Sequence, residues 1–125
     1  MTVDIRDQRR RQPREPSPAT ARPANDVFIS SIEKTYAAGI DVIRRKNADY
    51  AKSEDPFRNF RLAEVAGVDV GRAILVRALD KMSRISNLLD RNPPAVIDEK
   101  LEDTLLDCIN YLAILKAWIE LGQKS

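Results

Sequence analysis

Apolar residues recur at steps of three and four along most of this chain, and no segment alternates with the period of two expected of a strand. Three long stretches have this helical spacing, and a shorter stretch lies between the first two. The predicted helices span about residues 26–46, 56–66, 69–91 and 98–121. The spacing therefore predicts an all-α fold, a helical bundle of three long helices plus one short helix.

The residues between these stretches are typical helix starts and stops. Asp55 and Pro56 match an N-cap followed by proline at the first helical position, and Gly67 is a typical end signal. Asp69 is the predicted N-cap of the second long helix. The polar stretch 47–54 is predicted to be a loop.

In the first helix, the residues predicted to face the core are Phe28, Ile32, Tyr36, Ile40 and Ile43.

The last helix needs more neighbouring helices to cover its apolar surface than a chain of this length supplies. The last helix is apolar nearly all round after Asp107, and such a helix has to be covered on several sides. We therefore expect a homo-oligomer, in which helices of neighbouring chains complete the bundle.

The first 25 residues differ in composition from the rest of the chain. They contain six arginines and three acidic residues, for a net charge of +3, and four of the seven prolines. Such a segment buries too little apolar surface to offset its ordering entropy, so we expect a disordered tail at 1–25 and one domain at 26–125. The domain is nearly neutral, so contact with nucleic acid is expected only weakly, through the basic tail. The alternative is a solubilising leader without a partner.

Composition excludes several kinds of site. The chain has no histidine, which rules out Ser-His-Asp triads and His-ligated zinc, and its single Cys108 rules out an internal disulfide. Its four glycines form no phosphate-binding loop. No stretch approaches the ~20 apolar residues of a membrane span, and the N-terminus lacks a secretion signal, so we expect a cytoplasmic protein. The remaining chemistry is that of carboxylates, Lys, Arg, hydroxyls and a bound metal.

Two sets of polar residues interrupt the apolar helices with the same spacing, i, i+4 and i+7. The sets are Asp80, Arg84 and Asn87 in the second long helix, and Asp103, Asp107 and Asn110 in the last helix. At about 100° per residue, each set forms one stripe along its helix.

Buried carboxylates in these stripes would each cost several kcal/mol without a cation nearby. Lys81 and Arg84 could supply that positive charge, and so could a divalent ion. Mg²⁺ prefers carboxylates and takes its remaining ligands from water and substrate phosphates, which Lys81 and Arg84 would then face. The alternative is a polar seam, in which Asp80 and Asp107 bond to the basic residues and fix the register of the helices.

Four segments together resemble a known family. They are residues 46–50, 55–60, 80–89 (DK-x-x-R-x-x-NL) and 102–111 (EDT-x-x-D-x-x-NY). The chain resembles, over roughly residues 28–120, the phage and bacterial nucleotide modification associated domain, which is similar to the MazG-like all-α nucleoside triphosphate pyrophosphohydrolases. The resemblance implies a dimer or tetramer that cleaves a nucleoside triphosphate to a monophosphate and pyrophosphate with Mg²⁺, or Mn²⁺ in its place.

The resemblance also implies roles for particular residues. Asp107 matches a metal ligand of the family, with Asp103 or Glu102 as its acidic companions, and Asp80 is the matching acid of the earlier helix. Ser83 stands where that earlier helix would have its second acid. The candidate metal ligands are thus Asp80, Asp103 and Asp107, and the candidate catalytic residues are Lys81, Arg84 and Glu102.

Residues 46–50 are the segment expected to contact the nucleotide. Asn and Asp can bind base or ribose edges, Tyr50 can stack on a base, and Lys46 can bind a phosphate. The alternative is that Asp49 caps a turn and Tyr50 fills the core. The candidate substrate-binding residues are Lys46, Asn47, Asp49, Tyr50, Asn87 and Asn110.

Three functions follow from these features. The first is a metal-dependent pyrophosphohydrolase of (phage) nucleotide metabolism. The second is a nucleotide-binding or regulatory module without turnover, which Ser83 favours because it replaces an acid. The third is a helical adaptor whose basic tail contacts nucleic acid, and it predicts salt-dependent DNA binding that disappears when 1–25 are removed.

Overall fold

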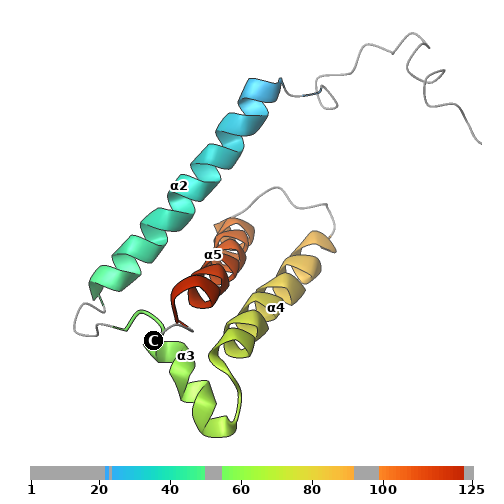
Figure 1. The fold of residues 1–125 in the computed structure, drawn as a ribbon. Helices are drawn as coiled ribbons and strands as arrows, with labels where there is room; N and C mark the ends of the chain where they lie inside the picture. The colour runs from blue at the N-terminus through green and yellow to red at the C-terminus, as the bar shows by residue number, and fades with distance from the viewer. Residues whose placement is uncertain (1–21, 23, 50–54, 92–98, 123–125) are drawn as a thin grey trace, which may run out of the picture. The chain divides into compact units, whose positions relative to one another are not determined.

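The computed structural model describes residues 22, 24–49, 55–91 and 99–122, and all its regular structure is helical in these residues (Figure 1). The elements are α2 (Asn25–Asp49), α3 (Arg58–Arg61), the 3-10 helix η1 (Leu62–Ala66), α4 (Val70–Leu89) and α5 (Glu99–Leu121). The prediction of an all-α fold with three long helices is confirmed. The predicted disordered tail lies outside the described residues up to residue 21. Within the described part of the chain, no helix combines the length and apolar composition needed to cross a membrane.

The chain divides into two compact units, Met1–Glu33 and Lys34–Ser125. The described part of the first unit is residues 22 and 24 and the start of α2, where Val27, Phe28 and Ile29 are exposed. The second unit contains the rest of α2 and all the other helices.

The predicted core face of α2 is wrong for most of its residues. Phe28, Ile32, Tyr36 and Ile40 are all exposed, and Tyr36 keeps 64% of its accessible surface. The covered positions of α2 in the second unit are Thr35, Ala38, Gly39, Val42 and Ile43. This face consists largely of small residues, and a helix with small residues can approach its neighbour closely.

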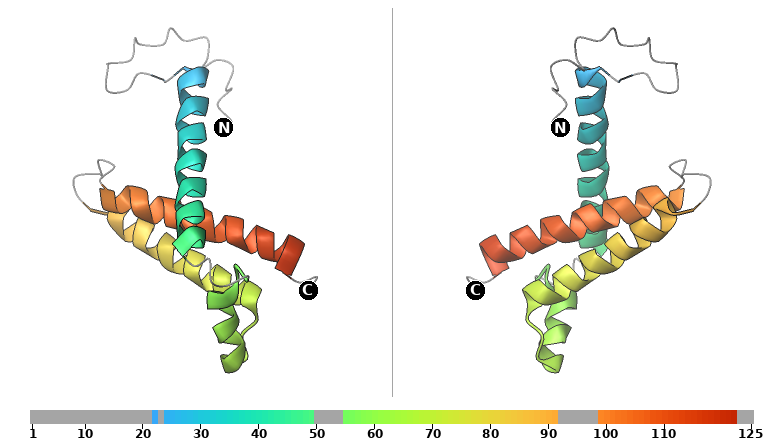
Figure 2. Two further views of the ribbon diagram at one scale, coloured as in Figure 1. Left: turned by 90° about the vertical axis from the view of Figure 1, so that its left-hand side faces the viewer. Right: turned by 90° about the vertical axis from the view of Figure 1, so that its right-hand side faces the viewer.

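Helices α4 and α5 lie side by side and run antiparallel (Figures 1 and 2). The Cys108 thiol donates a weak hydrogen bond to the Ala78 carbonyl at 3.7 Å, and Gly71, near the start of α4, lies against Trp118, near the end of α5. The buried apolar residues of this pair are Val70, Ile74, Ala78 and Leu88 on α4 and Leu101 and Cys108 on α5. Their steps are sums of threes and fours, which places one face of each helix against the other.

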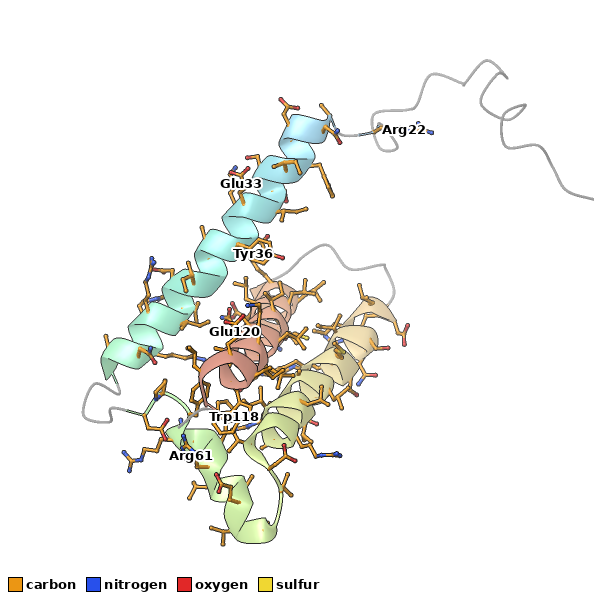
Figure 3. All side chains as sticks on the ribbon, in the orientation of Figure 1. Arg22, Glu33, Tyr36, Arg61, Trp118 and Glu120 are labelled. Carbon is orange, nitrogen blue, oxygen red and sulfur yellow. The ribbon has the colours of Figure 1, made fainter. Side chains whose placement is uncertain are left out.

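An aromatic group closes one end of the α4–α5 pair. Phe57, Val70 and Ile74 form a buried cluster against which Trp118 packs, with the Phe57 and Trp118 ring centroids 5.2 Å apart. The Arg61 guanidinium lies 5.2 Å from the centre of the Trp118 ring, and Figure 3 shows the two side chains close together. This packing connects the short helices to the long ones.

The helix boundaries agree with the local signals in two places. Gly67 has a φ of 77°, the left-handed conformation that favours glycine, directly after η1. Asp69 caps α4, because its carboxylate accepts a hydrogen bond from the Arg72 N–H at 3.1 Å.

Two other boundaries differ from the prediction. Helix α2 extends to Asp49, so the first residues of the predicted loop 47–54 are helical and the rest lie outside the described residues. An exposed last turn with Lys46 is compatible with polar residues, because it needs no apolar face. Pro56 precedes the short helix, which begins at Arg58, since Asp55 caps a turn through the Phe57 N–H at 3.0 Å.

Candidate functional site

A charged pair joins α4 and α5 near the middle of their contact. Lys81 Nζ lies 3.0 Å from the Oδ2 atom of Asp107, and the two side chains are 26% and 32% exposed. Both residues were predicted as site residues, one as catalytic and the other as a metal ligand. A pair with this exposure contributes at most about 1 kcal/mol to stability. A ligand that reaches the seam can therefore compete for either partner.

Three further polar residues of α4 were expected to share a site with this pair. Asp80, Arg84 and Asn87 are exposed, and they stand roughly 60 to 120° round α4 from Lys81. Asp80 and Asn87 stand roughly 160–180° round α4 from the buried Ala78, which contacts α5, so these two lie on the outer face of α4 and only Arg84 lies nearer to the seam.

The acidic residues of α5 separate into two groups. Asp103 lies one turn before Asp107, within about 40° of it round the helix, and is exposed. Glu102, the predicted catalytic carboxylate, is also exposed but stands roughly 140° away from Asp107 round the same helix. Within one chain, Asp103 and Asp107 share a side and Glu102 does not.

The described residues contain no group of three or more Cys, Asp or Glu side chains that could hold a metal ion by itself. A nucleotide-bound Mg²⁺ needs only one or two protein carboxylates, because water and phosphates supply its remaining ligands. Asp107 and Asp103 offer two carboxylates on one side of α5. This donor set fits an ion that arrives with a nucleotide better than a metal held by the protein alone.

Asn110, a predicted substrate-binding residue, makes a contact inside the second unit. Its side chain is 7% exposed, and its Nδ2 atom donates a hydrogen bond to the Gly39 carbonyl of α2 at 3.1 Å. A Cβ atom at Gly39 would lie 3.0 Å from the Asn110 Oδ1 atom. The amide therefore holds α2 against α5 and is enclosed.

Sequence reasoning did not single out Gly39, although a signal for it exists. Glycine inside a helix costs about 0.5–1 kcal/mol relative to alanine, and its presence there often marks a close approach of two backbones. In α2 that approach is the contact with Asn110.

The predicted nucleotide-binding segment is described only in part. Lys46 and Asn47 are exposed on the last turn of α2. The backbone of Asp49 ends the helix, while its side chain and Tyr50 lie outside the described residues.

A second charged group lies beside Trp118, and sequence reasoning did not single it out. Asp55 forms an ion pair and hydrogen bond with the Arg61 Nε atom. The hydrogen bond from Arg61, with a weaker one from the Phe57 N–H, holds the pKa of Asp55 below its usual value of 3.8. Because Arg61 also lies over Trp118, this group stabilises the fold at the aromatic end.

Comparisons with protein-family profiles, with curated proteins and with solved structures find no match to this chain.

Proposed function

We propose that the protein binds a nucleoside triphosphate together with Mg²⁺, or Mn²⁺ in its place, and hydrolyses it to a monophosphate and pyrophosphate. The proposed setting is the nucleotide metabolism of a bacterial or phage-infected cytoplasm. The observation that carries the proposal is the half-exposed Lys81–Asp107 pair, which lies within the two motif segments 80–89 and 102–111.

The proposed roles follow from the positions of the charges. Asp107 and Asp103 would hold the metal, since they share one side of α5. A bound divalent ion polarises phosphoryl oxygens and generates a nucleophilic water. Because Lys81 and the ion compete for the same carboxylate, Lys81 would turn from Asp107 to a phosphate, with Arg84 one turn along α4.

A second candidate function is nucleotide binding without turnover. It is favoured by the ammonium group of Lys81, which already neutralises Asp107, and by the lack of a three-carboxylate group within the described part of the chain. In that case the site would bind phosphates through Lys81 and Arg84, without a metal.

Pyrophosphate release by the full-length protein tests the first proposal. The protein is incubated with each nucleoside triphosphate and Mg²⁺, and wild type is compared with Asp107→Asn. We expect release to fall by about 100-fold or more in the variant, because a charge essential to the transition state is lost. Glu120→Gln is the matched control, since Glu120 also pairs with a lysine on α5 but is more exposed.

Calorimetric titration with nucleotide separates the two functions. Binding without release, equally strong with and without Mg²⁺, would replace the first proposal with the second. Release that is unaffected by Asp107→Asn would exclude Asp107 as a metal ligand, and absence of both binding and release would contradict both functions.

A further inference from the structure

The contact between α2 and α5 centres on a buried polar pair. Gly39 is the only buried residue among the described residues of α2, and Asn110 of α5 is 7% exposed. The Asn110 Nδ2 atom donates a hydrogen bond to the Gly39 carbonyl at 3.1 Å. Within α2 that carbonyl already has its helical partner four residues on, so the helix does not need the bond from the amide. The bond therefore serves to fix α2 against α5.

Asp107 stands between the two helices that contact α5 at this level. Cys108 lies about 100° from Asp107 in one direction round α5, and its thiol bonds to Ala78 of α4. Asn110 lies about 60° from Asp107 in the other direction and about 4.5 Å along the helix axis, and it bonds to α2. The Asp107 carboxylate is thus flanked by α2 and by α4, which supplies Lys81 at 3.0 Å.

The last turns of α2 carry a lysine on the face that Gly39 occupies. Three cations follow one another there, Arg44, Arg45 and Lys46. Lys46 stands within about 20° of Gly39 round α2, two turns further along, whereas Arg44 and Arg45 stand about 120–140° away. Arg45 is paired with Asp41 at 3.3 Å, and Lys46 makes no ion pair with any residue that the structure describes. Lys46 is therefore the cation of these turns that α2 presents on its α5 side.

The chain after α2 leads to the side of α5 that α4 covers. Phe57 comes eight residues after Asp49, the last residue of α2, and packs against Val70 at the start of α4. The hydrogen bond at Gly39 and this return to α4 together hold the end of α2 on the side of α5 where Lys81 lies.

We propose that Asn110 is a positioning residue of the nucleotide site. Its hydrogen bond to Gly39 holds the last turns of α2 so that the ammonium group of Lys46 binds a phosphate of the nucleotide at Asp107. Asn110 acts through Lys46 and does not touch the nucleotide, because its side chain is enclosed. This inference rests on the proposed function.

Steady-state pyrophosphate release by the full-length protein tests the role of Asn110, with the nucleoside triphosphate that wild type hydrolyses fastest. Asn110→Leu fills the same space without the hydrogen bond. We expect its KM to rise about 10-fold with kcat unchanged, because a charged hydrogen bond to the substrate is lost. A merely structural role would instead reduce the amount of folded enzyme, which lowers kcat and leaves KM unchanged.

Variants on the α2 side of the contact show whether Asn110 acts through Lys46. Lys46→Met should raise KM by the same factor as Asn110→Leu, and the double variant should raise it no further, so that the two effects are not additive. Gly39→Ala disturbs the same contact from α2, since its new methyl group meets the Asn110 amide, and it should also raise KM.

Thr104→Val is the matched control. Thr104 lies as far before Asp107 as Asn110 lies after it, is 4% exposed, and donates its hydrogen bond to the Lys100 carbonyl within α5. This variant should have the KM of wild type.

The possible outcomes separate this inference from the proposed function. A wild-type KM in Asn110→Leu, an equal rise in Thr104→Val, or additive effects of Asn110→Leu and Lys46→Met would overturn the inference while the proposed function stands. If wild type binds the nucleotide without releasing pyrophosphate, dissociation constants from calorimetry replace KM in the same comparison. A wild type that neither binds nor hydrolyses a nucleoside triphosphate would overturn the proposed function and this inference together.

Discussion

Asp107 and Asn110 stand one turn apart on α5, yet they lie in different environments. Asp107 is half-exposed and bonded to a lysine on α4, whereas Asn110 is buried and bonded to a backbone carbonyl of α2. Both interrupt the apolar pattern of the helix with a polar side chain. The difference shows that a polar residue in an apolar helix is left partly open to solvent or is enclosed according to what lies opposite it.

Asn110→Asp should have the largest effect, because it buries a carboxylate against the Gly39 carbonyl. We expect a loss of about 3 kcal/mol or more in the free energy of unfolding at neutral pH. Burial raises the pKa of the new carboxyl in the folded state, so the loss grows as pH rises above about 4, the usual value of Asp in the unfolded chain. Urea unfolding followed by circular dichroism at several pH values measures it, and a loss that does not depend on pH would show that the carboxylate reaches solvent.

Gly39→Ala should have an intermediate effect. The new methyl group would meet the Asn110 Oδ1 atom at 3.0 Å, so the helices must separate slightly or the hydrogen bond must break. We expect a net loss of about 1 kcal/mol after the gain in helix propensity is counted.

The double variant Gly39→Ala, Asn110→Ala is the control for this contact. It removes the clashing amide, and the Gly39 carbonyl keeps its bond within α2, so part of the stability should return in a double-mutant cycle. Additive losses would mean that the two residues do not interact.

Asp107→Asn should change stability little, by about 0.5 kcal/mol, because the ion pair with Lys81 is partly solvated. The same urea unfolding experiment measures this change beside Asn110→Asp, its mirror-image substitution. A loss comparable to that of Asn110→Asp would mean that the two positions do not differ in this way. It would favour the alternative in which Asp107 fixes the register of the helices.

The smallest effect is expected at Asp55, a second ion pair that is partly exposed. Because Arg61 lowers the pKa of Asp55 in the folded state, the pair contributes stability above the unfolded value of 3.8, and this contribution is lost as pH falls through the lower folded value. Asp55→Asn should remove this acid dependence, which thermal unfolding of both proteins between neutral and acid pH would reveal. If the variant loses stability at acid pH as much as wild type does, other carboxyl groups cause that loss.

Local sequence signals predicted the elements well because each signal acts over a few residues. Asp69 caps α4 through its own third neighbour, and Gly67 ends η1 through its own backbone conformation. The predicted end of α2 near residue 46 is too early, because polar residues typical of a loop also occur at an exposed helix end.

The candidate site was predicted only in part, for a physical reason. Spacing identified the stripe with Asp107 and Asn110, and a lysine on α4 was expected as a partner for the acid. Spacing within a helix cannot tell which face of it another helix covers. Spacing therefore gives no sign of the bond between Asn110 and Gly39, and the covered face of α2 differs from the predicted one.

The sequence by itself determined that this chain is helical and where most of its helices begin and end, since helix periodicity and capping depend on neighbouring residues. Only the tertiary structure decided which faces are covered, because small residues such as Gly39 allow a closer approach than larger apolar ones. The pairing of Lys81 with Asp107 follows from that choice of faces.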